Sequence, residues 1–183
     1  DVVAPDTNGL GVGALNAQQG EALIDKEFAD SPRLSIQTPE LSGSIALMGA
    51  RFDDIELNNF PTSLAENAPS IRLLEHSTLE NNNTWQVSYG WNSADGNPNN
   101  MPNSKTLWTI ESGTILTPES PVTLKYEAPN GLIFRQHISV DAHYMFTVKQ
   151  SVENTSETAF TLFPFGRITR LGAVPDAPIF VLD

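Results

Sequence analysis

The sequence predicts an all-β protein, an antiparallel β-sandwich, on three observations. Apolar and polar residues alternate with a period of two along much of the chain, which places apolar side chains on one face of a strand. The pair Asn130-Gly131 joins two such runs, and Asn-Gly favours the positive φ angles of a tight hairpin turn. Roughly a dozen short apolar runs recur at the ~8–12-residue spacing that is typical of sandwiches and barrels.

The stretch 121–152 has the clearest pattern and predicts a three-stranded antiparallel meander. Asn130-Gly131 closes its first connection, and Asp141-Ala142-His143 is expected to close the second. Side chains two apart on a strand share a face, so each strand has one apolar face. The three apolar sets are Val122, Leu124 and Tyr126; Leu132, Phe134, Ile138 and Val140; and Tyr144, Phe146, Val148 and Val152.

The chain divides into a leading arm, residues 1–31, and a sandwich domain, residues 32–183. The start of the arm is rich in small residues, Gly and Asn, and its apolar and polar residues do not alternate as in a strand. This composition predicts a flexible arm or linker. Glu21–Phe28 fits two helical turns. An isolated helix of that length is marginal in water, so we expect disorder or a docked turn there.

The strands are expected to begin after Pro32, with one at 34–38 and two within 41–57. In the second of these two, Phe52 falls on the opposite parity from Ile55 and Leu57. Such a mismatch predicts a bulge or bend near Asp53-Asp54, or a strand covered on both faces.

The remaining segments are expected to be short strands separated by polar loops and turns. The loops and turns are expected at 58–70, 80–83 and 92–104. The strands are expected at 71–74, 85–91, 107–110 and 114–116, and, after the meander, at 160–165, 167–171 and 179–182.

Composition excludes several functional classes. The net charge is −12, with ten basic and twenty-two acidic residues, so neither a nucleic-acid footprint nor attraction to anionic lipid headgroups is expected. There is no cysteine, which excludes disulfides, thiolate nucleophiles and cysteine-ligated zinc. No apolar run approaches the ~18–20 residues of a membrane-spanning helix. Because the chain opens on Asp1 without a signal peptide, we expect a mature product or an excised domain.

The titratable residues predict no catalytic, cofactor-binding or metal-binding site, and no cofactor. The three histidines, His76, His137 and His143, are too scattered in the sequence for the three or four ligands of a zinc site. Strand parity favours an exposed His137. Asp54 and Glu56 share a strand face and are interpreted as the solvated side of an edge.

An aromatic row, Trp85, Tyr89 and Trp91, alternates along one predicted strand. Aromatic side chains in such a row can stack on sugars or bases. They more often belong to the core, and we favour the core interpretation.

Six segments of the chain, in this order, resemble one known family. Together they are similar to the large periplasmic domain of the bacterial membrane-protein insertase YidC, in its alphaproteobacterial form, over about 33–182. The segments are GSIALMGARFDDIEL (43–57), SIRLLEH (70–76), WQVSYGW (85–91), KTLWTIESGTILTPESPVTLKYEAPNGLIFRQHISVD (105–141), YMFTVKQSVENTS (144–156) and LFPFGRITRLG (162–172).

The resemblance implies an antiparallel β-supersandwich resembling galactose mutarotase and carbohydrate-binding folds. In the family this domain follows a first transmembrane helix and precedes a five-helix membrane core that performs insertion. The arm 1–31 would be the tether to that first helix, and no functional residue carries over to this chain. The family's domain continues past the position of Asp183, so the resemblance implies a sandwich truncated at its C-terminal end, with an exposed edge that is prone to association.

The resemblance also implies a function and partners. The first hypothesis is a non-catalytic domain on the periplasmic side of the bacterial inner membrane, anchored by transmembrane segments outside this chain. Its partners would be accessory subunits of the Sec translocon and nascent membrane-protein substrates. An alternative is a mutarotase-like sugar-binding or sugar-processing protein, which would need His137, His143 and a carboxylate to line one cleft. A third is a secreted sandwich module such as a surface adhesin.

Overall fold

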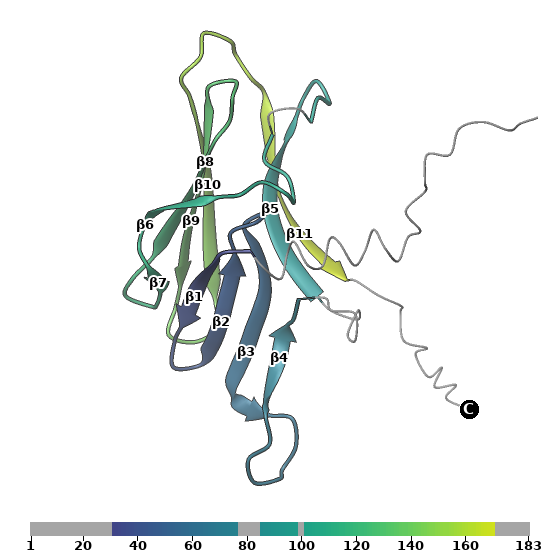
Figure 1. The fold of residues 1–183 in the computed structure, drawn as a ribbon, viewed down its shortest axis with the longest axis vertical. Coiled ribbons are helices and arrows are strands. Elements are labelled where there is room, and N and C mark those ends of the chain that lie inside the picture. The colour runs from purple at the N-terminus through teal and green to yellow at the C-terminus, as the bar shows by residue number, and fades with distance from the viewer. Residues whose placement is uncertain (1–30, 77–84, 99–100, 171–183) are drawn as a thin grey trace, which may run out of the picture.

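The structure, a computed structural model, describes residues 31–76, 85–98 and 101–170. These residues form eleven β-strands in two sheets (Figure 1), so the predicted all-β class is confirmed. Within these ranges there is no helix of the length and apolarity needed to cross a bilayer. The predicted helical turns at 21–28, the turn at 80–83 and the strand at 179–182 lie outside the described residues.

The first sheet has seven strands in the order β11-β5-β3-β2-β1-β7, with β4 also paired to β3. All its pairs are antiparallel except a short parallel pair between β1 and β7, which the antiparallel prediction did not include. Its strands are β1 (Arg33–Gln37), β2 (Leu41–Ala46), β3 (Arg51–Pro61), β4 (Ser70–Leu74), β5 (Trp85–Ser93), β7 (Ile115–Leu116) and β11 (Leu162–Arg170).

The second sheet has four antiparallel strands in the order β10-β9-β8-β6. They are β6 (Thr109–Ser112), β8 (Val122–Glu127), β9 (Leu132–Val140) and β10 (Phe146–Asn154). Strands β8, β9 and β10 are the predicted meander. In the first connection Gly131 has φ +83°, and its N–H donates to the Ala128 carbonyl at 3.1 Å. The predicted Asn-Gly hairpin is therefore confirmed.

The second connection of the meander is longer than predicted, because it includes Tyr144 and Met145. Asp141 Oδ1 accepts the N–H groups of His143 and Met145, at 2.9 and 3.0 Å. This turn holds the chain out of the sheet until Phe146, where β10 begins. Tyr144, predicted to face the core, is instead 43% exposed.

The predicted bulge is confirmed and lies at Asp53. Ser44 of β2 faces Asp54, but the next residue, Ile45, faces Phe52, so Asp53 is the extra residue of β3. The extra residue lets Phe52 and Ile55 both reach the core despite their opposite parity, with exposed fractions of 3% and 2%. A bulge changes which face the following residues occupy.

Two predicted boundaries were wrong. The loop expected at 58–70 is shorter, because β3 runs on to Pro61 and pairs there with Ser70, the first residue of β4. The two strands expected at 160–165 and 167–171 are one strand, β11, which pairs with β5 without interruption. Its internal Pro164 is tolerated because a proline on an edge strand need not donate a ladder hydrogen bond.

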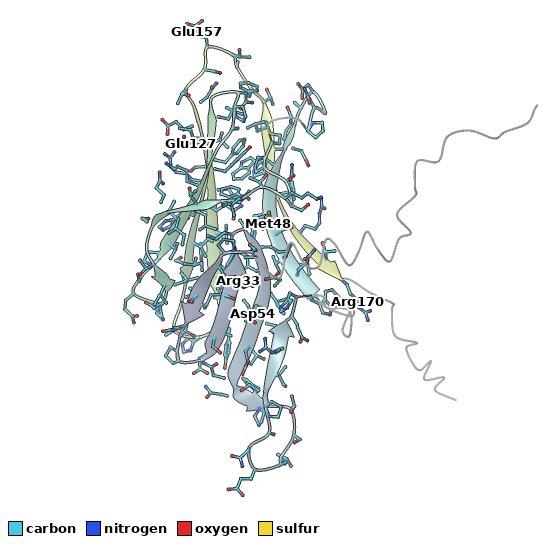
Figure 2. All side chains as sticks on the ribbon, in the orientation of Figure 1. Arg33, Met48, Asp54, Glu127, Glu157 and Arg170 are labelled. Carbon is cyan, nitrogen blue, oxygen red and sulfur yellow. The ribbon has the colours of Figure 1, made fainter. Side chains whose placement is uncertain are left out.

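The core lies between the two sheets, and side chains from both fill it (Figure 2). Strand β9 alternates strictly, with its core-facing residues buried and the residues between them half-buried or exposed. The first sheet also extends beyond its partner. Ile71 and Leu73 of β4, Trp85 of β5 and Ile168 of β11 are between 39% and 70% exposed.

Candidate functional site

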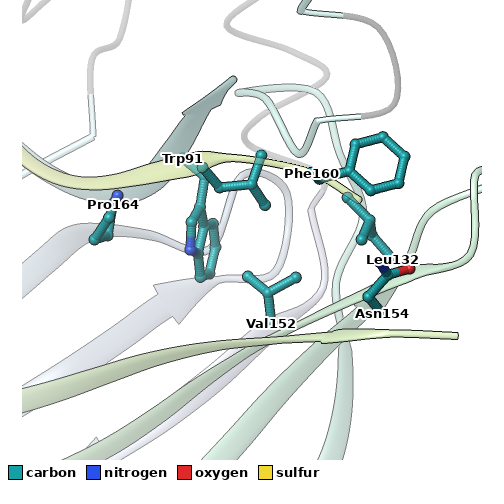
Figure 3. A pocket seen from close by; sticks show the side chains of 7 residues that line it. Trp91, Leu132, Val152, Asn154, Phe160 and Pro164 are labelled. Atoms are coloured by element: carbon teal, nitrogen blue, oxygen red, sulfur yellow. The ribbon is translucent and has the colours of Figure 1, made fainter. Parts of the chain in front are cut away.

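The candidate site is a pocket between the two sheets that is open to the surface (Figure 3). It has a volume of about 290 Å³. One wall comes from β5 and β11 and the connection before β11, and the other comes from β9 and β10. The lining residues are Trp91, Leu132, Val152, Asn154, Phe160, Leu162 and Pro164.

The pocket lining has no titratable side chain. Its one polar member, Asn154, is engaged in its own loop. Asn154 Nδ2 donates to the Thr158 carbonyl at 2.7 Å, and Asn154 Oδ1 accepts the Ser156 N–H at 3.0 Å. General acid–base catalysis needs a titratable group within hydrogen-bond reach of the reacting atom. The pocket lining therefore holds no group for such catalysis.

Trp91 lines the β5 wall of the pocket and packs against other core rings. Its ring lies 5.0 Å from that of Phe134 and 6.4 Å from that of Trp108, centroid to centroid, and the side chain is 5% exposed. The core interpretation of the aromatic row is confirmed for Trp91. It was wrong for Trp85, which is 46% exposed, because the second sheet does not extend over the start of β5.

The structure does not bring the histidines together. His137 lies on the outer face of β9, exposed as predicted, with Nδ1 3.1 Å from Thr123 Oγ1. His143 is exposed in the β9–β10 connection, and His76 follows β4. None of the three lines the pocket. Across 31–76, 85–98 and 101–170 no group of three or more His, Asp or Glu side chains could hold a metal ion.

A buried ion cluster surrounds Asp53, and the sequence prediction missed it. Asp53 is 1% exposed and lies 2.5 Å from an Arg33 guanidinium nitrogen and 2.7 Å from an Arg51 one. The bulge turns this carboxylate inward, so both arginines can reach it. The parity mismatch in the sequence indicated the bulge, but nothing local to Asp53 indicated its two partners.

The interpretation of Asp54 and Glu56 as the solvated side of a sheet edge was wrong. Strand β3 has β2 on one side and β4 and β5 on the other. Asp54 and Glu56 do share a face, and Arg72 of β4 pairs with both, at 2.9 and 3.5 Å. Ser44 of β2 donates to Asp54 at 2.6 Å. These acids therefore form cross-strand pairs within the sheet.

A second charge network covers the outer face of the four-stranded sheet. Arg135 of β9 contacts Glu111 at 2.9 Å and Glu153 at 2.8 Å, one on each side. The hydrogen bonds to Glu111 and Glu153 raise the pKa of Arg135, and the hydrogen bond from Arg135 lowers the pKa of Glu111. Lys125 pairs with Glu127 at 2.9 Å. Of these pairs, Arg135–Glu153 joins the neighbouring strands β9 and β10, Arg135–Glu111 reaches across β8 to β6, and Lys125–Glu127 lies within β8. Exposed ion pairs of this kind contribute little to stability.

A polar clamp joins the two sheets through the β9–β10 connection. The Tyr144 hydroxyl donates to Glu40 Oε2 at 2.9 Å, from the β9–β10 connection to the β1–β2 turn. The Tyr144 ring lies 6.2 Å from that of Phe60 at the end of β3. The hydrogen bond to the Glu40 carboxylate raises the pKa of Tyr144, because the carboxylate favours the neutral phenol.

Comparisons with known proteins give this fold a family. The family model of the YidC periplasmic domain matches residues 33–180. Relatives named membrane protein insertase YidC are 44% identical over 84% of this chain in Dinoroseobacter shibae, 38% over 91% in Mesorhizobium japonicum and 40% over 85% in Nitrobacter hamburgensis. The matches cover 25%, 28% and 25% of those relatives, so this chain spans about a quarter of their length. The chain belongs to the YidC periplasmic domain family.

Proposed function

We propose that the chain is a non-catalytic interaction domain of a membrane-protein insertase, which inserts and folds proteins of the bacterial inner membrane alone or with the Sec translocon. The observation that carries the proposal is the family match over 33–180, together with relatives named as insertases. The domain lies on the periplasmic side and is anchored by transmembrane segments outside these residues. Residues 1–31 are the tether to the preceding segment.

The arrangement of the described residues supports a binding role. The side chains that line the pocket are mostly apolar, and none of them is titratable. Many of the charged side chains form pairs that hold strands together, as around Asp53 and Arg135. The partners of the domain are accessory subunits of the translocon and nascent membrane proteins.

Crosslinking in cells tests this proposal. A photoreactive phenylalanine analogue replaces Phe163 of β11 or Leu64 of the β3–β4 loop in the full-length protein; these side chains are 57% and 105% exposed. We expect ultraviolet-dependent adducts with translocon subunits, or with radiolabelled nascent membrane proteins after a short pulse. The same analogue at the buried Phe134 is the control. If exposed positions gave only the adducts found at Phe134, the domain would not be an interaction domain.

Protease access tests the location. Protease added outside spheroplasts should cleave the full-length protein within this domain and leave a cytoplasmic marker intact. Protection of the domain in intact spheroplasts, with cleavage only after lysis, would contradict the periplasmic location.

The sugar-processing alternative is not favoured, since His137 and His143 do not line the pocket. Nothing in the described residues favours the adhesin hypothesis either.

A further inference from the structure

We propose that strands β5 and β11 form a hinged flap along one side of the pocket, and that the side-chain amides of Gln136 and Gln150 are its latch. Opening of this flap would widen the pocket toward the buried ring of Trp91. This motion does not depend on the proposed insertase function.

The flap is a two-stranded ribbon with strong internal pairing. Strands β5 and β11 run side by side away from the rest of the first sheet (Figure 1) and stay in register over nine residue pairs, from Leu162↔Ser93 to Arg170↔Trp85. Each of the two ribbon glycines, Gly90 and Gly166, is covered by an aromatic ring from the paired strand. An added Cβ at Gly90 would meet the Phe165 ring at 2.7 Å, and one at Gly166 would meet the Tyr89 ring at 3.2 Å. The ribbon therefore moves as one body.

The hinge is the weak junction between this ribbon and the sheet. Strand β5 pairs with β3 at one position, Phe52↔Val87, while the C-terminal half of β3 pairs with β4. A junction of one residue pair resists rotation much less than a ladder of nine, because each further backbone hydrogen bond fixes the relative orientation of two strands. Beyond Val87 the ribbon is held to the rest of the protein mainly by side chains.

The latch holds β5 beyond the start of β3, past its one paired position Phe52↔Val87. Gln136 Nε2 donates to the Tyr89 carbonyl at 3.2 Å, and Gln150 Nε2 donates to the Gly90 carbonyl at 2.9 Å. The two glutamines face each other across β9 and β10. Successive carbonyls of a strand point to opposite sides, so one glutamine pairs a β5 carbonyl that faces away from β11 and the other adds a second bond to a carbonyl of the β5–β11 ladder.

Two opposing contributions act on the closed latch. Gln136 is 0% exposed, and its Oε1 has no hydrogen-bond partner among the described residues. A buried unpaired acceptor opposes the closed state, and hydration on opening relieves that cost. The donated bonds and the contacts of Trp91 with Phe134 and Trp108 favour the closed state.

The pocket lies directly beside the latch. Val152, on the pocket wall, is two residues from Gln150 on the same face of β10. Trp91, Leu162 and Pro164 come from the ribbon, and Leu132 and Val152 come from the opposite sheet (Figure 3). Rotation of the ribbon about Val87 therefore separates the two walls of the pocket.

Thiol labelling of the full 183-residue chain tests the flap, because the sequence contains no cysteine. The probe is Leu132→Cys, at a pocket-lining residue that is 1% exposed. The reference probe is Ala46→Cys in β2, which is 0% exposed and lies outside the ribbon. The rate of reaction with an aromatic disulfide reagent is measured for each probe with and without Gln150→Leu.

Loss of the Gln150 bond should speed labelling at Leu132→Cys by about two- to ten-fold, the range expected for one neutral hydrogen bond. Labelling at Ala46→Cys should stay unchanged. The matched control is Gln37→Leu, at an exposed position of β1, which should change neither rate. Equal acceleration at both probes would mean global destabilisation. No acceleration at Leu132→Cys would mean that Gln150 is no latch. Either result overturns the proposal.

Discussion

The contribution of Asp53 to stability depends on its position in the bulge of β3. Its carboxylate is 1% exposed and contacts Arg33 and Arg51. A charge in such a site is stable only while its partners remain, because removing one partner leaves the other charges buried and uncompensated. Asp54, the next residue, pairs with Arg72 at a more exposed site. Two adjacent aspartates therefore contribute differently to stability.

Asp53→Asn should lower the free energy of unfolding by about 3 kcal/mol, since it removes the charge that two arginines share. Asp54→Asn should lower it by less than about 1 kcal/mol, because exposed ion pairs contribute little. Urea denaturation followed by circular dichroism measures both. If the free energy of unfolding fell equally in the two variants, burial of Asp53 at the bulge would not determine its contribution to stability.

Asp141 should make stability depend on pH. The N–H groups of Met145 and His143 lower the pKa of Asp141 in the folded protein, whereas an unfolded aspartate has a pKa of about 3.9. A lowered folded pKa contributes stability above the unfolded value, and this contribution is lost as the pH falls through the folded value. Asp141→Asn should therefore narrow the difference in melting temperature between pH 7 and pH 3. Glu66→Gln, in an exposed loop, should leave that difference unchanged, and a narrowing in both variants would contradict the role of Asp141.

At the scale of elements, the β2–β3 pair depends on Gly43, which lies opposite Ile55. Gly43 has φ +140°, and an added Cβ would lie 2.1 Å from the Asp54 carbonyl oxygen. The backbones of β2 and β3 approach this closely next to the bulge, where pairing shifts by one residue. Only glycine leaves room for that approach.

Gly43→Ala should destabilise the protein by about 3 kcal/mol, from a strained φ and a clash with backbone. Gly96→Ala is the matched control, since Gly96 has φ +69° but nothing within 4 Å of an added Cβ. It should cost about 1 kcal/mol from the backbone conformation alone. Thermal and urea unfolding compare the two. If Gly43→Ala lowered the free energy of unfolding by less than Gly96→Ala, strands β2 and β3 would have to move apart easily.

The whole molecule has unequal sheets, and this leaves apolar surface open. Strands β10 and β11 each have one strand partner among the described residues. Trp85 and Ile168 remain exposed where the seven-stranded sheet extends beyond the four-stranded one. Unpaired edges beside apolar side chains favour association between chains.

The 183-residue chain should therefore self-associate as its concentration rises. Ile168→Lys should weaken the association constant by about ten-fold, because burying one isoleucine stabilises a contact by roughly 1.5 kcal/mol or more. Leu64→Lys, at a fully exposed loop position away from the strand edges, should have no effect. Sedimentation equilibrium measures all three chains. Association that persists unchanged in Ile168→Lys would place the contact elsewhere.

Several elements could be predicted from local pattern because their determinants are local. The Asn130-Gly131 turn and the alternation on both sides of it predict the β8–β9 pair. The parity change between Phe52 and Ile55 predicts the bulge. The end of β3 and the continuity of β11 could not be predicted in this way, since pairing with another strand extended β3 to Pro61 and carried β11 through Pro164.

The candidate site was less predictable than the fold. Its walls come from residues as far apart in the chain as Trp91 and Pro164, and none of them has a distinctive sequence motif. The latch residues Gln136 and Gln150 lie on the apolar faces of their strands. The alternation of apolar and polar residues does not predict what a glutamine on such a face would bind. Asp53 likewise shows no local sign of its two arginine partners.

The sequence by itself determined the all-β class, the meander, its hairpin turn and the bulge. Each of these follows from the period of two and the conformational freedom of a few residues, which act over short stretches of chain. Only the tertiary structure decided the burial of Asp53, the exposure of Trp85 and the position of the pocket. Burial and pairing between distant segments depend on how two sheets of unequal size stack, and no local pattern records that.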